Sequence, residues 1–374
     1  MVDDQAGRQT QGLQATGRQT AAIILAAGRS TRMKTELPKV MHEICGRPML
    51  SYVLDACREA RITTLHLVVG FAKETVIQAF SHDPDVRFVE QREQKGTGHA
   101  VMVCAEAFKG FSGDVVVIAG DMPTIRSQTL QQLLATHRSA AAAASIATTV
   151  LAEPKGYGRI IRGSDGRFER IVEHRDCTPE QLTIHEVNPS YYCFDSQALF
   201  TALPKLRADN AKGEYYITDT LAVIREGGGL VQAAVSVPAE DAVGINSRAE
   251  LADVAKVMQR RIQADWMERG VTIVDPGNTW IDSRVRIGAE TVIKPFTCVE
   301  GFARVGAGCV VGPFACIEDG SVIEDGSRVG PGVLRALDAT GGGRTSRESE
   351  TKRNAQCVRR PPAQTGCGEV RTRE

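Results

Sequence analysis

The feature that most constrains the fold is a six-residue repeat in the C-terminal third of the chain. From Ile281 an aliphatic residue returns at every sixth position, and a small or β-branched residue stands four positions after each one. This period is typical of a parallel β-helix, in which each aliphatic side chain stacks on its equivalent one coil away. An ordinary set of strands and turns is the alternative, but nine consecutive matches favour the β-helix. The aliphatic positions are Ile281, Ile287, Ile293, Val299, Val305, Val311, Ile317, Ile323 and Val329, and the small or branched ones are Val285, Thr291, Thr297, Ala303, Cys309, Ala315, Ser321, Ser327 and Val333.

The part of the chain before this repeat alternates strand-like and helix-like segments. The runs "AAIILAAG", "TLHLVVGF", "VRFVEQ" and "DVVVIAGD" are short and mostly unbroken by polar residues, as in strands buried on both faces of a parallel sheet. Amphipathic segments at 48–60, 73–80 and 127–138 lie between them. We therefore expect an α/β fold with a mixed, mainly parallel sheet covered by helices. From Gly156, "GYGRIIRGSDGRFERIVE" predicts an antiparallel hairpin that adds a side sheet.

Composition and local signals predict where these parts begin and end. The first twenty residues are polar, and the residues after Val333 are rich in Arg, Gly, Ser and Thr without an apolar period, so neither segment is expected to order itself. The abrupt loss of pattern also fits a shifted reading frame. Between the two folded parts, Ser247 and Glu250 form a capping-box pattern and Gly270 a stop signal for one helix. The expected organisation is a disordered tail at 1–20, an α/β domain at 21–246, a connecting helix at 247–270, a short β-helix at 271–333 and a disordered or aberrant tail at 334–374.

The overall composition excludes several classes of protein. Lysine plus arginine and aspartate plus glutamate both number 45, so no bulk charge attracts nucleic acid or an acidic membrane. No apolar stretch approaches the roughly 18 residues of a membrane-spanning helix, and the polar N-terminal segment is not a signal peptide. The ten cysteines are scattered, without CxxC pairs or metal-ligand spacing. We expect a cytoplasmic protein with no nucleic-acid partner, no membrane insertion and no disulfide framework.

The loop after the first apolar run, "LAAGRSTRMKTELPKV", predicts a phosphate-binding site. Gly28 lets a ligand approach the backbone, and successive turn amides can cradle phosphate oxygens. Arg29, Arg32, Lys34 and Lys39 add positive charge at the carboxyl end of a central strand, where open α/β sheets bind ligands. We therefore expect a polyphosphate, most simply a nucleoside triphosphate. A solvated basic turn is the alternative, because neither GxxxxGK[ST] nor GxGxxG is present.

Two further segments suit a nucleotide site. Asp121 ends the run "DVVVIAGD" and presents a hard carboxylate at the same edge of the sheet, although a strand-end aspartate is also a common turn residue. The segment "KGTGHA", residues 95–100, combines amide and backbone groups that suit a base edge, but it can equally be a plain turn before a helix.

The motifs together resemble a known family. The opening loop is similar to the signature LxxGxGTRMxxxxPK of sugar-nucleotide pyrophosphorylases, with Ser30 in place of the usual glycine. The segments "EQREQKGTGHAV", "GDMPTI", "GYGRIIR", "IVEHRD", "EVNPSYYCFD" and "NAKGEYYITD" then follow in the order of the bifunctional N-acetylglucosamine-1-phosphate uridylyltransferase/glucosamine-1-phosphate acetyltransferase family. The resemblance covers about residues 21–333. It implies a Rossmann-like nucleotidyltransferase domain followed by a short left-handed β-helix with three hexapeptides per coil.

The resemblance also implies roles for individual residues. Arg32 and Lys39 would neutralise the phosphates of UTP, while Asp121 and Asn246 would bind Mg²⁺ with the help of substrate phosphates and water. Separate groups of residues would hold the nucleotide and the sugar. The nucleotide-binding residues would be Leu25, Ala26, Ala27, Gly28, Gln91, Gly96 and Thr97, and the sugar-binding residues Gly158, Glu173 and Asn188.

The implied reaction is attack of the phosphate of N-acetylglucosamine-1-phosphate on the α-phosphorus of UTP, with release of pyrophosphate, in the synthesis of cell-envelope precursors. In the family, the second activity, acetyl transfer, takes place in a longer β-helix, where a histidine serves as general base. All seven histidines of this chain precede the repeats, so acetyl transfer is expected to be absent. The short β-helix implies a possible homotrimer. Two alternatives stay open: a nucleotidyltransferase for dTTP or another sugar phosphate, and a non-catalytic regulatory protein on the same core.

Overall fold

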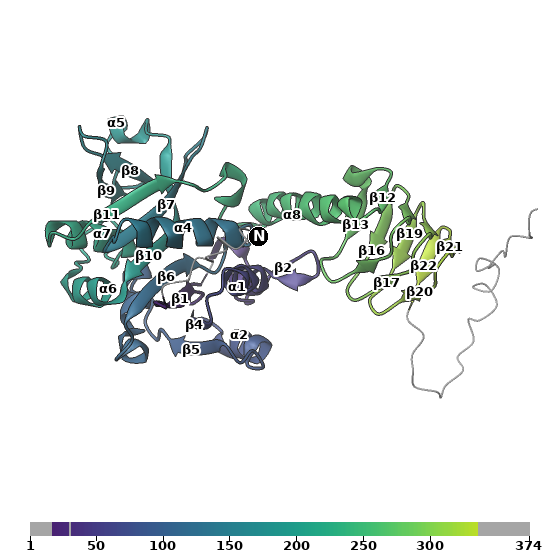
Figure 1. Cartoon of the computed structure of the whole chain (residues 1–374), viewed down its shortest axis with the longest axis horizontal. Coiled ribbons are helices and arrows are strands. Elements are labelled where there is room, and N and C mark those ends of the chain that lie inside the picture. Colours follow the sequence, from purple (N-terminus) through teal and green to yellow (C-terminus); the bar gives the residue numbers. More distant parts are fainter. Residues whose placement is uncertain (1–16, 30, 336–374) are drawn as a thin grey trace, which may run out of the picture. The chain divides into compact units, whose positions relative to one another are not determined.

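The computed structural model describes residues 17–29 and 31–335. The chain divides into two compact units between Val254 and Ala255 (Figure 1). Most of the tail predicted at 1–20 and nearly all of the one predicted at 334–374 lie outside the described residues. Within the described ranges, no helix is both long and apolar enough to cross a membrane.

The first unit contains a mixed sheet in the order β11-β7-β10-β6-β1-β4-β5. Neighbouring strands are parallel except β10, which runs antiparallel to both β6 and β7. The strands β8 and β9 form the predicted hairpin, which joins the sheet through β10. The bounds of the strands are β1 Gln19–Leu25, β4 Thr64–Val69, β5 Val86–Glu90, β6 Gly113–Ala119, β7 Ala144–Val150, β8 Gly158–Arg162, β9 Phe168–Val172, β10 Glu186–Asp195 and β11 Val231–Val235, with a separate two-stranded ribbon of β2 Glu43–Ile44 and β3 Arg47–Pro48.

Helices cover this sheet because their apolar faces complete its core. One large cluster joins side chains of the sheet, such as Ile23 and Val117, to Val101, Leu199 and Leu221 of α3, α6 and α7. The helices are α1 Met49–Glu59, α2 Lys73–Phe80, α3 Thr97–Met102, α4 Ser127–Ser139, α5 Pro179–Leu182, α6 Ser196–Ala202, α7 Ile217–Glu226 and α8 Arg248–Glu268, with 3₁₀ turns η1 Thr31–Met33, η2 Lys39–Met41, η3 Ala105–Phe108, η4 Leu203–Lys205, η5 Ala239–Asp241 and η6 Pro276–Asn278.

The first strand begins earlier than the sequence predicted. Residues Gln19 and Thr20 already belong to β1, so the predicted tail at 1–20 is wrong for these two residues. The preceding Arg18 forms an ion pair with the fully buried Asp114, joined by Nε and Oδ1 at 2.6 Å. The polar composition of this segment concealed the pairing, because the partner carboxylate lies far away in the sequence.

The connecting helix α8 begins and ends where its local signals predicted. The hydroxyl of Ser247 accepts a hydrogen bond from the amide of Glu250 at 3.3 Å, which satisfies a free amide of the first turn. At the other end, Gly270 adopts a φ of +87°, a left-handed conformation that glycine tolerates best. The division between the two units falls inside this helix, at Val254.

The second unit is a parallel β-helix of three stacked sheets. Paired strands are offset by 18 residues, as in Ile281 opposite Val299 and Ile287 opposite Val305, so three hexapeptides make one coil. The repeated aliphatic side chains fill its core. The sheets are β12-β15-β18-β21, β13-β16-β19-β22 and β14-β17-β20, with β12 Thr272–Ile273, β13 Thr279–Ile281, β14 Arg286–Ile287, β15 Val292–Ile293, β16 Thr297–Val299, β17 Arg304–Val305, β18 Val310–Val311, β19 Ala315–Ile317, β20 Val322–Ile323, β21 Arg328–Val329 and β22 Gly332–Leu334.

The register of the last strand differs from the six-residue pattern by one position. Leu334 pairs with Ile317, although the period would put Arg335 there. Val333, the last small or branched residue of the pattern, is 54% exposed. The shift keeps an aliphatic side chain against the core and leaves the arginine outside it. The predicted fold class, a mixed α/β sheet followed by a left-handed β-helix, is confirmed.

Candidate active site

A cavity of about 430 Å³ lies at the carboxyl ends of β1, β5 and β6 in the first unit. It is lined by every residue that the sequence predicted for the nucleotide and for the metal, although these residues are far apart along the chain. The carboxyl ends of parallel strands meet at one edge of the sheet, which explains how they come together. These lining residues are Leu25, Ala26, Ala27, Gly28, Arg32, Lys39, Gln91, Gly96, Thr97, Asp121 and Asn246.

The glycine loop after β1 is held in place by its backbone. The amide of Ala26 donates to the carbonyl of Val68 at 3.0 Å, and the carbonyl of Ala27 accepts from the amide of Phe71 at 3.1 Å. A Cβ on Gly70 would lie 2.9 Å from Ala27, so this second glycine is needed for the close approach. A Cβ on Gly28 would meet no atom within 4 Å. The backbone therefore faces open space at Gly28, as a ligand-binding loop requires.

Lys39 lies between the two residues predicted to bind a metal ion. Its ammonium group forms an ion pair with the carboxylate of Asp121 and donates a hydrogen bond to Oδ1 of Asn246 at 3.2 Å. The side chains of Lys39 and Asp121 are only 16% and 18% exposed. The structure thus shows two oxygen donors converging on one cationic group.

This arrangement fits a divalent cation. The ammonium of Lys39 marks a point that carboxylate and amide oxygens reach together, and hard oxygen donors are what Mg²⁺ prefers. Among the described residues, no group of three His, Cys, Asp or Glu side chains is placed to hold a metal. A bound ion would therefore need further oxygen ligands from a substrate and from water.

The base-binding candidates form a rigid corner beside the loop. Gln91 is 3% exposed, and its side-chain amide donates to the carbonyl of Gly96 at 3.2 Å. Gly96 has a φ of +104°, and a Cβ there would lie 2.5 Å from the carbonyl oxygen of Tyr215. The hydroxyl of Thr97 accepts from the amide of Ile217 at 3.1 Å. The corner is thus built against the start of α7, and glycine is required at its centre.

The residues predicted to bind the sugar form a separate group that does not line this cavity. Asn188 of β10 pairs with Gly158 of β8, and a Cβ on Gly158 would lie 3.5 Å from Oε1 of Glu173. The amide nitrogen of Asn188 donates to the hydroxyl of Tyr192 at 2.7 Å, and its oxygen accepts from the amide of Ser190 at 2.8 Å. The structure therefore brings the three predicted residues together.

Two carboxyl groups near this second group have unusual proton affinities. Burial raises the pKa of Glu173, with smaller opposing and supporting effects from nearby charges. Burial also raises the pKa of Asp219 to about 6, aided by the neighbouring carboxylates Asp209 and Asp176. Such shifts are common in functional sites, where charge is removed from water for a ligand.

The structure adds residues that the sequence did not single out. Gln94 and Glu214 line the cavity beside Arg29 of the predicted basic loop, whose guanidinium lies over the ring of Phe71 at 4.9 Å from its centroid. Gln94 and Glu214 stand in segments already quoted for the resemblance, but nothing in their local pattern marks a ligand. They reach the cavity only through the fold.

Comparison with known proteins agrees with this geometry. Residues 22–221 match the model of the MobA-like NTP transferase domain, more than half of the chain. The chain belongs to this family. It is also 44% identical over 281 residues to the "Bifunctional protein GlmU" of Clostridium botulinum strain Loch Maree, and 43% and 42% identical to the proteins of that name in Clostridium acetobutylicum and Clostridium tetani. The alignments cover 75% of this chain and 61% of each relative.

A solved structure supports the fold of this NTP transferase. The crystal structure of UDP-glucose pyrophosphorylase complexed with UDP-glucose has a TM-score of 0.53 and 20% sequence identity, covering 65% of this chain and 99% of that one. At this identity the likeness concerns the fold alone. The family resemblance inferred from the motifs is confirmed, and the chain carries a sugar-phosphate nucleotidyltransferase domain.

Proposed function

We propose that this protein transfers UMP from UTP to N-acetylglucosamine-1-phosphate and releases pyrophosphate. The observation that carries the proposal is the meeting of Lys39, Asp121 and Asn246 beside the loop at Leu25–Gly28. The identity of over 40% to proteins named GlmU supports this reaction in particular. Because the chain spans 61% of the length of these relatives, their whole activity is not transferred to it.

The reaction needs positioning and charge neutralisation more than proton transfer. The attacking phosphate is already an anion, so no general base is required. The amides of Ala27 and Gly28 would orient the triphosphate, while Gln91 and the backbone near Gly96 would hold the base edge. Mg²⁺, when bound at Asp121 and Asn246, would supply positive charge to the phosphates.

Lys39 and Arg32 would act on the same phosphates as the ion. As the triphosphate enters, the ammonium of Lys39 has a better partner than Asp121 alone, since several phosphate oxygens share the negative charge. Its departure would free the carboxylate of Asp121. Arg32, exposed at the cavity wall, would meet the outer phosphates and stabilise the pyrophosphate leaving group. The sugar phosphate would bind toward Gly158, Glu173 and Asn188.

A pyrophosphate-release assay tests the proposal. UTP with N-acetylglucosamine-1-phosphate and Mg²⁺ should give turnover, and dTTP or other sugar-1-phosphates should give much less. Faster turnover with one of those pairs would replace the proposed substrates with another sugar nucleotide. No release with any pair would support a non-catalytic protein.

Asp121→Asn provides the matched variant. We expect turnover to fall by about a hundredfold or more with the fold intact, because the change removes one charge but few atoms. Near-normal turnover at saturating Mg²⁺, with an unchanged circular dichroism spectrum, would contradict the assigned role. The expected absence of acetyl transfer and the possible homotrimer stay predictions, which assays with acetyl-CoA and sedimentation measurements would test.

A further inference from the structure

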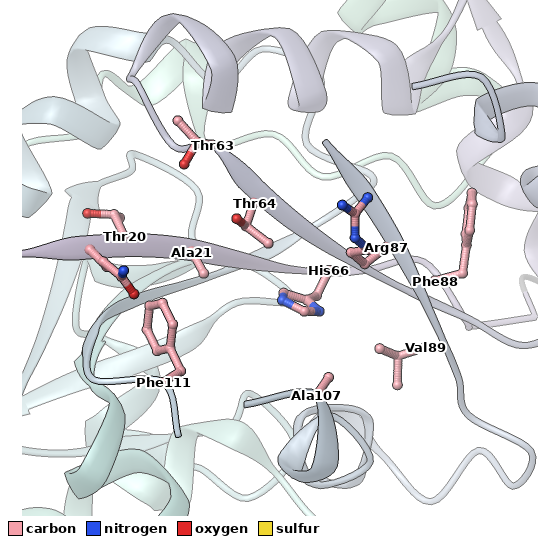
Figure 2. Close-up of a pocket in the computed structure, with 11 residues that line it drawn as sticks. Thr20, Ala21, Thr63, Thr64, His66, Arg87, Phe88, Val89, Ala107 and Phe111 are labelled. Carbon is pink, nitrogen blue, oxygen red and sulfur yellow. The ribbon is translucent and has the colours of Figure 1, made fainter. Parts of the chain in front are cut away.

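A second cavity, of about 540 Å³, lies at the other end of the sheet from the candidate active site. It opens at the amino ends of β1 and β4, where Gln19 and Thr64 begin these strands, and the turn η3 bounds it. Its volume falls in the range of small-molecule sites. Figure 2 shows its lining side chains, with the imidazole of His66 near the middle of the group. Nothing in the proposed transfer reaction uses this cavity.

His66 is a buried polar group that lacks a partner. The residue is 7% exposed, and its Nδ1 atom is fully buried without a hydrogen bond among the described residues. The ring packs against Phe108, with their centroids 4.5 Å apart. Burial lowers the pKa of His66, and the charge of Arg87 lowers it further. The imidazole is therefore neutral at pH 7, with hydrogen-bonding capacity that the protein leaves unused.

Arg87 gives the cavity a positive charge. It is the cross-strand partner of His66 in the β4–β5 register, so both side chains arise from the same face of the sheet. One terminal nitrogen of the guanidinium donates to the carbonyls of Pro84 and Val86, at 2.7 Å and 3.0 Å. Arg87 forms no ion pair with the residues that the structure describes, although the pKa of Asp85, lowered mainly by its hydrogen bond with Arg58, is lowered further by the charge of Arg87. None of the residues lining the cavity is acidic.

The remaining walls combine apolar and hydroxyl surfaces. Phe111, Ala107 and Val89 present carbon atoms to the cavity, while Thr64 presents a hydroxyl group near its mouth. A flat apolar body would cover the carbon surfaces, and an acidic group would meet Arg87. The same charge also draws an anion toward His66, whose imidazole lines the cavity.

We propose that this cavity binds a small organic anion with a flat apolar body, its acidic group at Arg87 and His66 and its body against Phe111 and Val89. The site is separate from the nucleotide cavity, which lies at the carboxyl ends of β1, β5 and β6. Its existence does not depend on the proposed transfer reaction.

Titration calorimetry on the full chain tests the proposal with simple probes. Phenyl phosphate and benzoate should bind saturably. Benzyl alcohol lacks the acidic group and inorganic phosphate lacks the apolar body, so each should bind at least about tenfold more weakly. Bound anion favours the imidazolium form of His66. Binding should therefore take up protons near pH 7, which is visible as a dependence of the measured heat on the ionisation enthalpy of the buffer.

Two variants and one control connect the binding to these residues. Arg87→Gln, an exposed position, should weaken phenyl phosphate binding about tenfold, and His66→Phe, which keeps a ring in the core, should abolish the proton uptake. Arg225→Gln removes an equal charge from exposed α7 and should change nothing. Absence of saturable binding up to about 10 mM of either aromatic anion would overturn the proposal. Equal affinity in wild type and Arg87→Gln, or equal affinity for inorganic phosphate, would also overturn it.

Discussion

Replacing Lys39 by methionine should make the protein bind a divalent ion more tightly in the absence of nucleotide. In the structure the ammonium of Lys39 lies against both proposed metal ligands, Asp121 and Asn246. An incoming ion must first displace it. Methionine keeps the length of the side chain but removes the positive charge, so the carboxylate of Asp121 and Oδ1 of Asn246 lose the cation that now occupies the place between them.

The size of the effect follows from the contacts that are lost. A hydrogen bond to a charged group contributes about 1.5–3 kcal/mol, and the pair here is largely shielded from water, with Asp121 only 18% exposed. Each 1.4 kcal/mol corresponds to a factor of ten in affinity, so Lys39→Met should bind Mn²⁺ about ten- to a hundredfold more tightly than wild type. Turnover should nevertheless fall, since Lys39 no longer neutralises the phosphates.

Electron paramagnetic resonance of free Mn²⁺ measures this affinity without any reaction. Arg32→Met is the matched control, because it removes the same charge from the cavity wall without a contact to Asp121 in the described structure. We expect a change of about threefold or less for the control. With UTP present, the advantage of Lys39→Met should largely disappear. Equal or weaker Mn²⁺ binding by nucleotide-free Lys39→Met would refute the reasoning.

Three further variants test other features. Gly96→Ala places a Cβ 2.5 Å from the carbonyl oxygen of Tyr215 at a φ of +104°, so it should lower the free energy of unfolding by about 1–3 kcal/mol and weaken UTP binding. Gly110 also has a positive φ but faces open space, so Gly110→Ala should leave the UTP affinity unchanged in fluorescence titrations. Asp219→Asn should raise Tm at pH 8 but not at pH 4. The pKa of Asp219 in the folded protein, about 6, exceeds the ordinary value of 3.8, so ionisation of the buried carboxyl as the pH rises between these values opposes folding. An equal shift of Tm at both pH values would contradict this. Thr291→Val removes the hydrogen bond that the Thr291 hydroxyl donates to the carbonyl of Gly306, at 2.7 Å, and the one that it accepts from the amide of Cys309, at 3.1 Å. The free energy of unfolding should fall by about 2 kcal/mol or more in urea titrations followed by tryptophan fluorescence. Thr272→Val, at an exposed position, should change it little.

The fold was predictable where a short-range pattern determines it. The six-residue period predicted the β-helix because an inward side chain must recur at each strand, and the 18-residue strand offset agrees with it. The period did not predict β12. Counted back from Ile281, the six-residue period puts the inward residue at position 275, whereas the structure pairs Ile273 with Ile293. The loop between Ile273 and Ile281 absorbs that difference through the turn η6. Local insertions of this kind leave no periodic signal.

The candidate site was predictable mainly because its residues belong to sequence motifs shared with sugar-nucleotide pyrophosphorylases. The loop at Gly28 and the strand-end Asp121 carry chemistry that sequence patterns express. Glu214 and Gln94 do not, because they reach the cavity through the tertiary fold. The cavity around His66 was likewise invisible: a histidine in the run "TLHLVVGF" looks like a core residue until the absence of a hydrogen-bond partner for Nδ1 is seen.

The 18-residue offset between stacked strands of the regular coils has a consequence for how this part of the protein can change length. Removing or duplicating 18 consecutive residues within the regular coils would return every side chain to an equivalent position on the prism, whereas a change of six or twelve would move each strand to a different face. Genetic gain or loss of whole coils is therefore structurally mild, and the unit can be lengthened or shortened in steps of one coil without redesigning its interior.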